Sequence, residues 1–342
     1  MIGFRIHSRR GRVGATPISF SRGVPDNDIG FAMTYHAEVS DAFAEHRQFL
    51  WDLSYRITGS SVDADALLRE CFTRAVASPP HDRDADWLGR LTTIEARLAV
   101  ATLRHRRHRE YPGYWLPAPV ETGDAASPTG RPDASASGPR YDLVESGSFA
   151  FLMALEGLEP RDRAIFVLCD VFGHEPSHAA RMLGPAPAGA RAALARGRRL
   201  MQSYDQIHVP PTPDVQKRTA NVLQQCLSHL QNRDGGGLEK VIAPDAQALY
   251  DNGGQFVAPV APVSGRTRIA RILVKFAEGM GPMRFDFRML NGLPAAVGES
   301  AGRPRWARRF VFRIETRDDG LVSEVHTITA TVKLAAVRLD PV

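Results

Sequence analysis

The stretch LTTIEARLAVATLRHRRHREYPGYWLP, from Leu91 to Pro117, changes character half way along. Its first half has Leu91, Ile94 and Leu98 at helical spacing, which predicts a helix with one face against a core. Its second half gathers cationic and aromatic residues: Arg104, His105, Arg106, Arg107, His108, Arg109, Tyr111, Tyr114 and Trp115. Cations neutralise phosphates and flat rings stack on unpaired bases, so this block suits opened or single-stranded DNA. A solvated basic helix end would have the same composition.

The length and the net charge of the chain are compatible with several domains and a polyanionic partner. A length of 342 residues suggests two or three domains. The formal net charge of +5 fits a nucleic-acid partner, and equally a surface that favours solubility. The three cysteines fall on apolar stripes of expected helices, which predicts core thiols in a reducing cytoplasm, and neither disulfides nor a zinc site: Cys71, Cys169 and Cys226. No apolar run is long enough to span a bilayer.

The N-terminal third is expected to be helical after a flexible start. Residues 1 to about 37 are basic and lack periodicity, which favours a flexible extension. A helix is expected from Ser40, as its cap, to Gly59, and a second helix after Ser60 or Ser61. The exposed side of the second helix carries charged residues, a common pattern that needs no function by itself. These residues are Asp63, Asp65, Arg69, Glu70 and Arg74.

Two segments rich in proline or glycine divide the rest of the chain. Residues 120–143 have almost nothing to bury, which predicts a flexible linker between independently folded units. Between this linker and the prolines of residues 206–213, the pattern predicts short helices, a turn at Gly184 and a basic helix. Its arginines are Arg191, Arg196, Arg198 and Arg199. A glycine turn before a closely packed basic helix describes a helix-turn-helix. Three-helix packing without a DNA role remains the alternative.

Residues 214–342 predict helices followed by a curved antiparallel sheet. A long helix from Val215 is expected to end at Gly235–Gly237, and another helix covers Arg266–Glu278. The run MRFDFRML from Met283 alternates apolar and charged residues, Asn291–Gly292 supplies a turn, and two more alternating runs follow. Helices first and strands afterwards indicate an α+β domain with one concave face.

In this order, the segments resemble the extracytoplasmic-function (ECF) sigma factors of the sigma-70 family that carry a fused SnoaL-like C-terminal domain. The resemblance spans residues 39 to 339. Its longer motifs are SYRITGSSVDADALLRE at 54–70, DWLGRL at 86–91, YPGYWLPAPV at 111–120 and ALEGLEPRDRAIFVLCDVFG at 154–173. DNGGQ at 251–255 and NGLPA at 291–295 resemble the two short motifs of the fused subgroup. Asn252 and Gln255 replace the usual glycine and lysine of the first of these.

The resemblance implies a multidomain chain: two all-α sigma domains, the second a helix-turn-helix, followed by an α+β SnoaL-like cone. The implied parts are a basic extension (1–38), sigma region 2 (39–119), a flexible linker (120–143), sigma region 4 (144–205), a second linker (206–213) and a regulatory domain (214–342). It further implies a factor without enzymatic activity or cofactor. This factor would bind the β′ clamp and β flap of the bacterial RNA polymerase core, direct it to promoter DNA, and be regulated by its own C-terminal domain.

The resemblance also assigns residues to each contact. Those implied to face the β′ clamp are Asp63, Asp65, Arg69 and Glu70. Those implied to recognise and open the minus-ten element are Arg97, Arg104, Arg106, Arg107 and Arg109. Those implied to enter the major groove at the minus-thirty-five element are Arg191, Arg196, Arg198 and Arg199. Those expected to carry the regulatory contact are Trp115, Leu116, Pro117, Asp251, Asn252, Gly253, Gly254, Asn291, Gly292 and Pro294.

Other functions fit parts of the sequence. SnoaL-like cones include isomerases and cyclases with a buried acid or histidine, for which the candidates here are Asp251, Asp286 and His326. The last two alternate with apolar residues, a pattern that places strand residues in water without any chemistry. A pocket in the cone that senses an unknown small ligand is a second possibility. A divergent DNA-binding regulator with weak or no polymerase binding is a third, in which residues 63–74 are ordinary surface.

Overall fold

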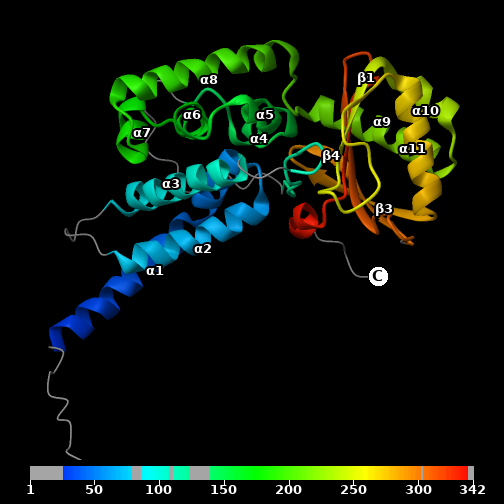
Figure 1. Cartoon of the computed structure of the whole chain (residues 1–342). Helices are drawn as coiled ribbons and strands as arrows, with labels where there is room; N and C mark the ends of the chain where they lie inside the picture. Colours follow the sequence, from blue (N-terminus) through cyan, green and yellow to red (C-terminus); the bar gives the residue numbers. More distant parts are fainter. Residues whose placement is uncertain (1–25, 79–85, 108–110, 123–138, 302, 338–342) are drawn as a thin grey trace, which may run out of the picture.

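The computed structural model describes residues 26–78, 86–107, 111–122, 139–301 and 303–337. Figure 1 shows two helical units packed together and a sheet domain beside them. None of the helices in these ranges combines the length and apolar character that a membrane crossing requires. The three cysteines are buried and unpaired, which confirms the expected core thiols.

Three long helices form the first unit: α1 (Asp26–Thr58), α2 (Ser61–Ala77) and α3 (Trp87–Arg107). Side chains cap two of them. The hydroxyl of Ser60 accepts the N–H of Asp63 at 3.2 Å, which confirms one of the two caps expected for the second helix. The carboxylate of Asp86 accepts the N–H of Gly89 at 2.8 Å at the start of α3.

The expected start of the first helix at Ser40 is wrong, because α1 already begins at Asp26. Tyr35 and Val39 are buried against the same core as the rest of α1, so tertiary packing continues the helix past the capping signal. The Ser40 hydroxyl donates to the carbonyl of His36 at 2.8 Å, which is a contact within the helix. The basic residues of the expected extension before residue 26 lie outside the described residues.

Shorter helical segments form the second unit. They are α4 (Leu143–Ser146), α5 (Phe149–Ala154), the 3₁₀ turn η1 (Leu155–Gly157), α6 (Pro160–Phe166), the π-helical η2 (Val167–Val171), α7 (Pro176–Leu183) and α8 (Pro187–Ile207). Gly184 ends α7 in the left-handed conformation with φ of 84°, which confirms the expected turn. A Cβ atom at Gly197 would lie 2.6 Å from the Phe166 ring, so glycine allows α8 to pack closely on α6.

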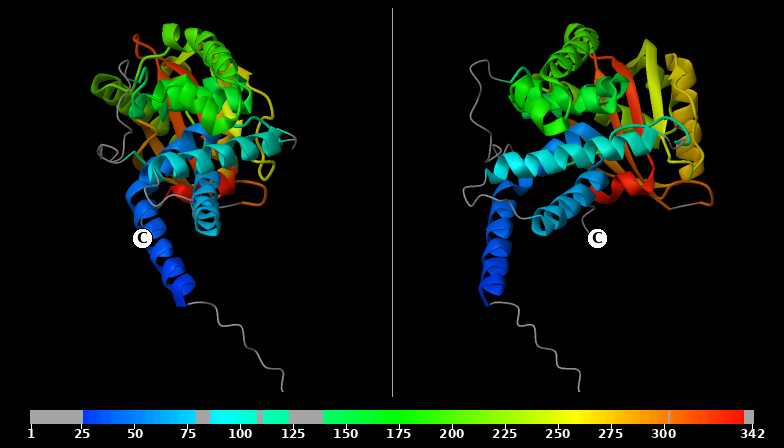
Figure 2. Two further views of the ribbon diagram at one scale, coloured as in Figure 1. Left: turned by 90° about the vertical axis from the view of Figure 1, so that its left-hand side faces the viewer. Right: turned by 60° about the vertical axis from the view of Figure 1, so that its left-hand side comes forward.

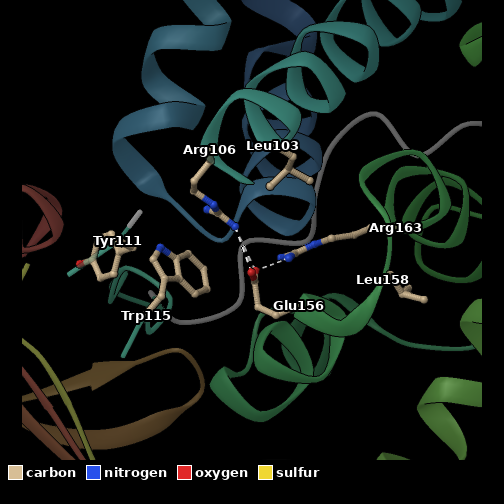
Figure 3. Close-up of a pocket in the computed structure, with 7 residues that line it drawn as sticks. All are labelled: Leu103, Arg106, Tyr111, Trp115, Glu156, Leu158 and Arg163. Carbon is tan, nitrogen blue, oxygen red and sulfur yellow. Dashed lines mark hydrogen bonds and ion pairs between the residues drawn. The ribbon is translucent and has the colours of Figure 1, made fainter. Parts of the chain in front are cut away.

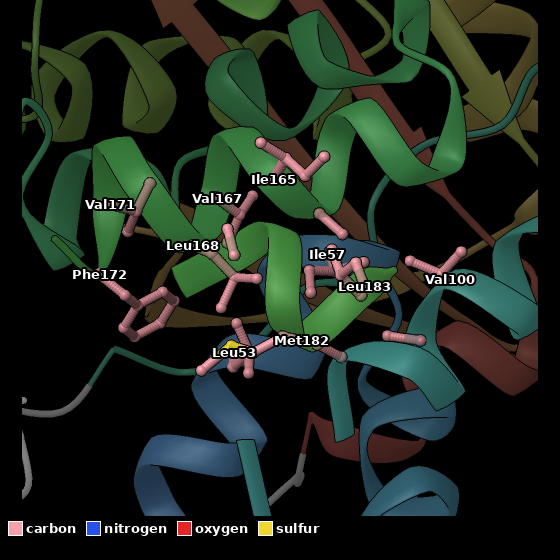
Figure 4. Packing of buried hydrophobic residues seen from close by; sticks show 14 of the residues in the cluster. Leu53, Ile57, Val100, Ile165, Val167, Leu168, Val171, Phe172, Met182 and Leu183 are labelled. Carbon is pink, nitrogen blue, oxygen red and sulfur yellow. The ribbon is translucent and has the colours of Figure 1, made fainter. Parts of the chain in front are cut away.

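The two helical units share one hydrophobic core. Leu53 and Ile57 of α1 pack together with Ile165 of α6 and Leu183 of α7 (Figure 4). The rings of Phe49 and Phe172 meet edge to face with centroids 5.0 Å apart. At the surface, the Arg97 Nε donates to the carbonyl of Met182 at 2.5 Å, which joins α3 to α7. The sequence suggested independently folded units, whereas these units bury apolar residues against each other.

Six strands form a single sheet in the order β2-β1-β6-β5-β4-β3. They are β1 (Ile242–Asp251), β2 (Val263–Ser264), β3 (Met283–Leu290), β4 (Leu293–Ser300), β5 (Arg309–Thr316) and β6 (Val322–Ile328). Only β1 and β6 pair in parallel within this sheet. The helices of this domain are α9 (Pro213–Gln231), α10 (Gly235–Val241) and α11 (Arg266–Met280), and the 3₁₀ helix η3 (Thr331–Ala336) follows β6.

The two faces of the sheet have different neighbours. Tyr250 and Phe312 belong to the cluster formed with α9 and α11. Their neighbours in the chain, including Leu249 and Val311, belong to a separate cluster on the opposite face. Figure 2 shows α11 on the side of the sheet that faces away from the helical units. The helical units and the segment around Leu116 therefore meet the face of the sheet that α9 and α11 leave open.

Two expectations for this domain are wrong. The glycines Gly235–Gly237 do not end the long helix but form the first turn of α10, because the carboxylate of Asp234 accepts the N–H of Gly237 and caps a new helix. The sheet is also not antiparallel throughout, because β1 pairs in parallel with β6, a strand far away in the chain.

Candidate nucleic-acid interface and regulatory junction

The segment Tyr111–Pro119 lies between the sheet and the helical units, and we call it the inner linker. Leu116 is completely buried in the cluster on the open face of the sheet, together with Phe149 of α5. The inner linker is also tied to the end of α1. The N–H of Ala118 donates to the carbonyl of Gly59 at 2.9 Å, and the hydroxyl of Tyr55 donates to the carbonyl of Ala118 at 2.7 Å.

Asp251 at the end of β1 binds the inner linker. Its carboxylate is fully buried and accepts the N–H of Leu116 at 2.8 Å and the hydroxyl of Tyr111. It also accepts the N–H of Gly253 at 3.3 Å, which forms the turn after the strand. The structure therefore brings together Asp251 and Leu116, which were both expected to carry the regulatory contact.

Lys333 of η3 completes this contact, and sequence reasoning missed it. Its ammonium group donates to the Asp251 carboxylate at 2.5 Å and to the carbonyl of Leu116. It lies 4.9 Å from the Tyr111 ring centre and 4.2 Å from that of Trp115. Burial lowers the pKa of Lys333 to about 8, although the nearby Asp251 carboxylate favours the charged form.

Arg106 at the end of α3 joins the two helical units and the inner linker. Its guanidinium donates to the carbonyl of Thr58 at 2.7 Å and to both carboxylate oxygens of Glu156 at 3.1 and 3.2 Å. It also lies over the ring of Trp115 at 4.2 Å. Arg163 of α6 donates to the same Glu156 carboxylate (Figure 3). In this arrangement, Arg106 binds protein groups at the position where DNA contact was expected.

Asn291 connects the sheet domain to both helical units. Its side-chain amide donates to the Tyr55 hydroxyl of α1 at 2.7 Å and to the carbonyl of Gly147, before α5, at 2.8 Å. Its side-chain oxygen accepts the N–H of Val120 at 3.0 Å. Asn291 is 1% exposed and has a φ of 53°, so it forms the tight turn between β3 and β4 as expected.

The remaining residues of the two short motifs shape the turns. Gly254 has a φ of 74°, and a Cβ atom there would lie 2.9 Å from Pro112 of the inner linker. At Gly292, a Cβ atom would lie 2.9 Å from Pro211, before α9. Asn252 donates to the carbonyl of Phe256 at 2.5 Å and so stabilises its own loop. Three further residues that were expected to carry the regulatory contact are partly or fully buried: Pro117, Gly253 and Pro294.

The arginines expected to bind DNA have different environments. Arg196 and Arg198 of α8 are about half exposed, and each makes a two-pronged contact, with Asp162 and Asp170 respectively. The exposed arginines of the expected DNA-binding set that lie outside these pairs are Arg97, Arg104, Arg191 and Arg199. The side chain of Arg107 and the whole of Arg109 lie outside the described residues. Their roles, like that of Arg97, stay predictions.

Two of the four residues expected to bind polymerase, Asp65 and Arg69, line a groove between α1 and α2. It has a volume of about 510 Å³. Its walls are Phe43, Arg47, Asp65, Leu68, Arg69, Phe72 and Thr73. Trp51 Nε1 donates to Asp65 at 2.8 Å, which fixes that carboxylate at the rim. Glu70 pairs with Arg74 at 2.7 Å within the helix, and Asp63 lies in its first turn.

The candidate catalytic residues Asp251 and His326 lie on the face of the sheet opposite to α9 and α11. Asp251 and His326 are completely buried on the open face of the sheet, and the register pairs Asp286 with Val297 of that face. The expectation that His326 faces water is wrong, because Phe149 of α5 stacks on its ring at 5.8 Å. The buried guanidinium of Arg313 lies beside the His326 and Phe149 rings. It is 3.0 Å from His326 Nδ1 and 4.1 Å from the Phe149 ring centre.

Comparisons with known proteins agree with this architecture. Residues 148–201 match the family model of sigma-70 region 4. The ECF RNA polymerase sigma factor SigJ of Mycobacterium tuberculosis is 30% identical over 282 residues, which are 78% of this chain and 86% of SigJ. SigG of the same organism is 26% identical over 281 residues, or 74% of this chain and 70% of SigG.

The crystal structure of SigJ from Mycobacterium tuberculosis superposes with a TM-score of 0.64 at 25% identity. It covers 88% of this chain and all of the SigJ chain, so helical units and sheet domain recur together. The chain therefore belongs to the extracytoplasmic-function RNA polymerase sigma factors, in the form that has an α+β domain after the two sigma regions.

Proposed function

We propose that residues 214–337 keep the two sigma regions of the same chain in a closed arrangement. We further propose that promoter-directed transcription starts when the contacts between residues 214–337 and the sigma regions are broken. The observation that carries the proposal is Asn291, whose side chain is hydrogen-bonded to α1, to the linker and to the turn before α5. One residue of the third domain thus contacts both halves of the sigma core and the segment that connects them. The contacts of Asp251 and Lys333 with Leu116 support the same role.

The closed arrangement does not fit a promoter. The minus-ten and minus-thirty-five elements are named after positions about 25 base pairs apart. At about 3.4 Å per base pair, this separation is roughly 85 Å of duplex. In the closed arrangement, α3 touches α7 through Arg97 and Met182, and α8 follows α7 directly. Because α3 and α8 are the helices expected to reach the two elements, the sigma regions have to separate before both elements are bound.

We assign the parts of the chain accordingly. Region 2 (39–119) contacts the β′ clamp at the groove between α1 and α2 and the minus-ten element through the end of α3. Region 4 (144–205) contacts the β flap and places α8 in the major groove of the minus-thirty-five element. The segments 120–143 and 206–213 connect these regions to each other and to the C-terminal domain (214–342). An unidentified small ligand is the proposed signal for release.

Deletion of the C-terminal domain tests the proposal. A chain that ends at His208 keeps α8 complete and lacks the contacts of Asn291, Asp251 and Lys333. We expect more transcript per mole from the shortened chain than from the full chain, with core polymerase on genomic DNA and mapped transcript starts. Equal output and equal start sites would contradict control within the chain.

The polymerase contact is tested by charge reversal. Asp63→Lys with Asp65→Lys places one cation at the α1–α2 groove and a second in the first turn of α2, so we expect weaker binding to core polymerase. The matched control reverses Glu278 and Asp319, two exposed acids of the C-terminal domain. Unchanged polymerase binding in the first variant would mean that the groove is not the contact.

The DNA contact of the basic block is tested by its salt dependence. Each phosphate contact that is lost lowers the slope of log K against log salt by about 0.9. We expect Arg106→Ala and Arg107→Ala to lower the slope for binding of the polymerase complex to promoter DNA. An unaltered slope in both variants would mean that the basic block makes no phosphate contact and is a solvated helix end.

A further inference from the structure

The excess positive charge of the chain lies in the C-terminal domain. Of the 43 arginines and lysines in the chain, 18 lie in residues 214–342, as do 13 of the 38 aspartates and glutamates. Residues 1–213 hold the remaining 25 of each kind. The whole net charge of +5 therefore belongs to the C-terminal domain, and the part of the chain with the two sigma regions has none. A charge of one sign that is gathered in one domain favours binding of a polyanion there.

One stripe of α11 carries three of these cations. Arg268, Arg271 and Lys275 are exposed and follow one another at spacings of three and four residues. They therefore share one side of the helix over a length of about 10 Å. Leu273 and Ala277 lie on the other side of α11, in the cluster that it forms with the sheet. The three cations thus point away from the core of the domain.

Residues 303–308, between β4 and β5, extend this stripe. The Trp306 ring covers Gly279, where any Cβ atom would overlap the ring, and Gly279 is one helical turn beyond Lys275. The Arg303 guanidinium donates to the carbonyl of Glu278 at 3.2 Å. This segment carries three more exposed cations: Arg303, Arg305 and Arg308. We call the six cations of α11 and of this segment the basic face.

The basic face is open to solvent in the closed arrangement. Figure 2 shows α11 on the side of the sheet opposite to the helical units, so the sigma regions do not cover it. Within the described ranges, none of the six cations forms an ion pair, in contrast to Arg196 and Arg198 of α8. The acid on the same stripe is Glu278, three residues after Lys275. Cations therefore outnumber acids on this face by a wide margin.

We propose that the basic face binds the phosphates of duplex DNA without reading the base sequence. Five of its six cations are arginines, whose guanidinium groups match phosphate oxygens in shape and donate two parallel hydrogen bonds. A single strand would need aromatic rings on which its bases stack. The aromatic ring at this face, that of Trp306, instead packs against Phe276 of α11 at 5.6 Å. The chemistry thus fits contacts with the backbone of a duplex.

The inference rests on membership of the sigma factor family and does not depend on the proposed release of the C-terminal domain. In the closed arrangement, α3 touches α7, so the helices expected to reach the two promoter elements are held together. The basic face lies elsewhere on the molecule and is free to contact DNA in this state. In this way, the domain that restrains the sigma regions also keeps them close to DNA.

The experiment measures fluorescence anisotropy of a labelled duplex of roughly 30 base pairs, or about 100 Å, with the full chain and without polymerase. In Arg271→Gln with Lys275→Gln, glutamine preserves helix propensity and removes two phosphate contacts. The slope of log K against log salt is expected to become shallower by about 1.8. The change should be equal for A·T-rich and G·C-rich duplexes, because phosphate contacts carry no sequence information.

The matched control is Lys217→Gln with Arg233→Gln. It removes the same charge from exposed positions of α9 and of the turn after it, outside the basic face. We expect the slope of the control to equal that of the unmodified chain. A variant of opposite sign is Glu278→Gln, which removes the acid from the stripe and is expected to strengthen duplex binding.

A second measurement needs no variant. Acetylation by acetic anhydride, followed by mass spectrometry, is expected to slow at Lys275 when the duplex is bound and to stay unchanged at Lys217. The proposal is overturned if the α11 variant and the control change the slope equally, or if the duplex does not protect Lys275. An equal loss of binding to phosphatidylserine vesicles would also overturn it, because the face would then respond to any anionic surface. Since these assays contain no polymerase, their failure leaves the transcription test of the shortened chain unaffected.

Discussion

Replacing Asn291 with alanine is expected to detach the C-terminal domain from both sigma regions. The change removes the three side-chain hydrogen bonds to Tyr55, Val120 and Gly147. At about 1 kcal/mol for each bond, the docked state loses about 3 kcal/mol, which lowers the ratio of docked to undocked molecules by about a hundredfold. The left-handed backbone at this position adds strain inside the hairpin, because alanine tolerates it less well than asparagine.

Hydrogen exchange followed by mass spectrometry measures this loss. The peptide that covers α4 and α5 (residues 143–154) lies against the open face of the sheet through Phe149. We expect its amide exchange to accelerate by up to about two orders of magnitude in Asn291→Ala, together with faster exchange in the inner linker. Transcription by the full-length variant is expected to rise toward the level of the chain that ends at His208.

Asn252→Ala is the control for this prediction. Asn252 is buried in the same domain, but its side chain bonds only to Phe256 and Gly254 of its own loop among the described residues. It should therefore change local stability and leave exchange in residues 143–154 within about tenfold of the unmodified chain. Equal acceleration in the two variants would refute the reasoning, because it would mean that Asn291 acts through the general stability of the sheet domain.

Three further outcomes follow from the same structure. Burial raises the pKa of Glu95 from 4.5 to about 7, so the folded state holds a proton that the unfolded state releases between these values, and the free energy of unfolding should fall by about 3 kcal/mol as pH rises from 4.5 to 7. Chemical denaturation at several pH values should show that Glu95→Gln removes this slope. Gly197→Ala should cost about 1–3 kcal/mol of stability through its clash with Phe166, measured by thermal unfolding. Asp251→Asn leaves the Lys333 ammonium buried without a carboxylate, so limited proteolysis should cut the inner linker faster than in the unmodified chain.

Local signals in the sequence predicted much of the fold. Gly184 at the end of α7 and Ser60 before α2 are correct because a left-handed glycine and a capping hydroxyl act within one helical turn. The turn at Asn291 is correct for the same reason. The start of α1 was not predicted, because Tyr35 packs into the shared helical core against residues that are far away in the chain. This packing outweighs the local capping signal at Ser40.

The candidate site was predicted in part. The positions of Asp251 and Asn291 followed from the resemblance to a family, but their partners did not. Lys333 is 82 residues from Asp251, and Glu156 is 50 residues from Arg106. No periodicity or spacing in the sequence records such distant pairs. The ion pairs of two arginines that were expected to bind DNA could not be predicted for the same reason, because Asp162 and Asp170 reach Arg196 and Arg198 only after α6 and α8 have packed.

If the two sigma regions separate as we propose, their shared core affects how this sigma factor competes for polymerase. Separation exposes side chains such as Leu53, Ile57, Ile165 and Leu183, at about 1.5–3 kcal/mol for each one that stays in water. A protein that binds its partner only in a rare state has an apparent affinity reduced by the fraction of molecules in that state. We therefore expect this factor to lose core polymerase to rival sigma factors while it is closed, even where it is the more abundant. Its share of the polymerase pool would then be set by how often the core opens and not by how much protein the cell makes.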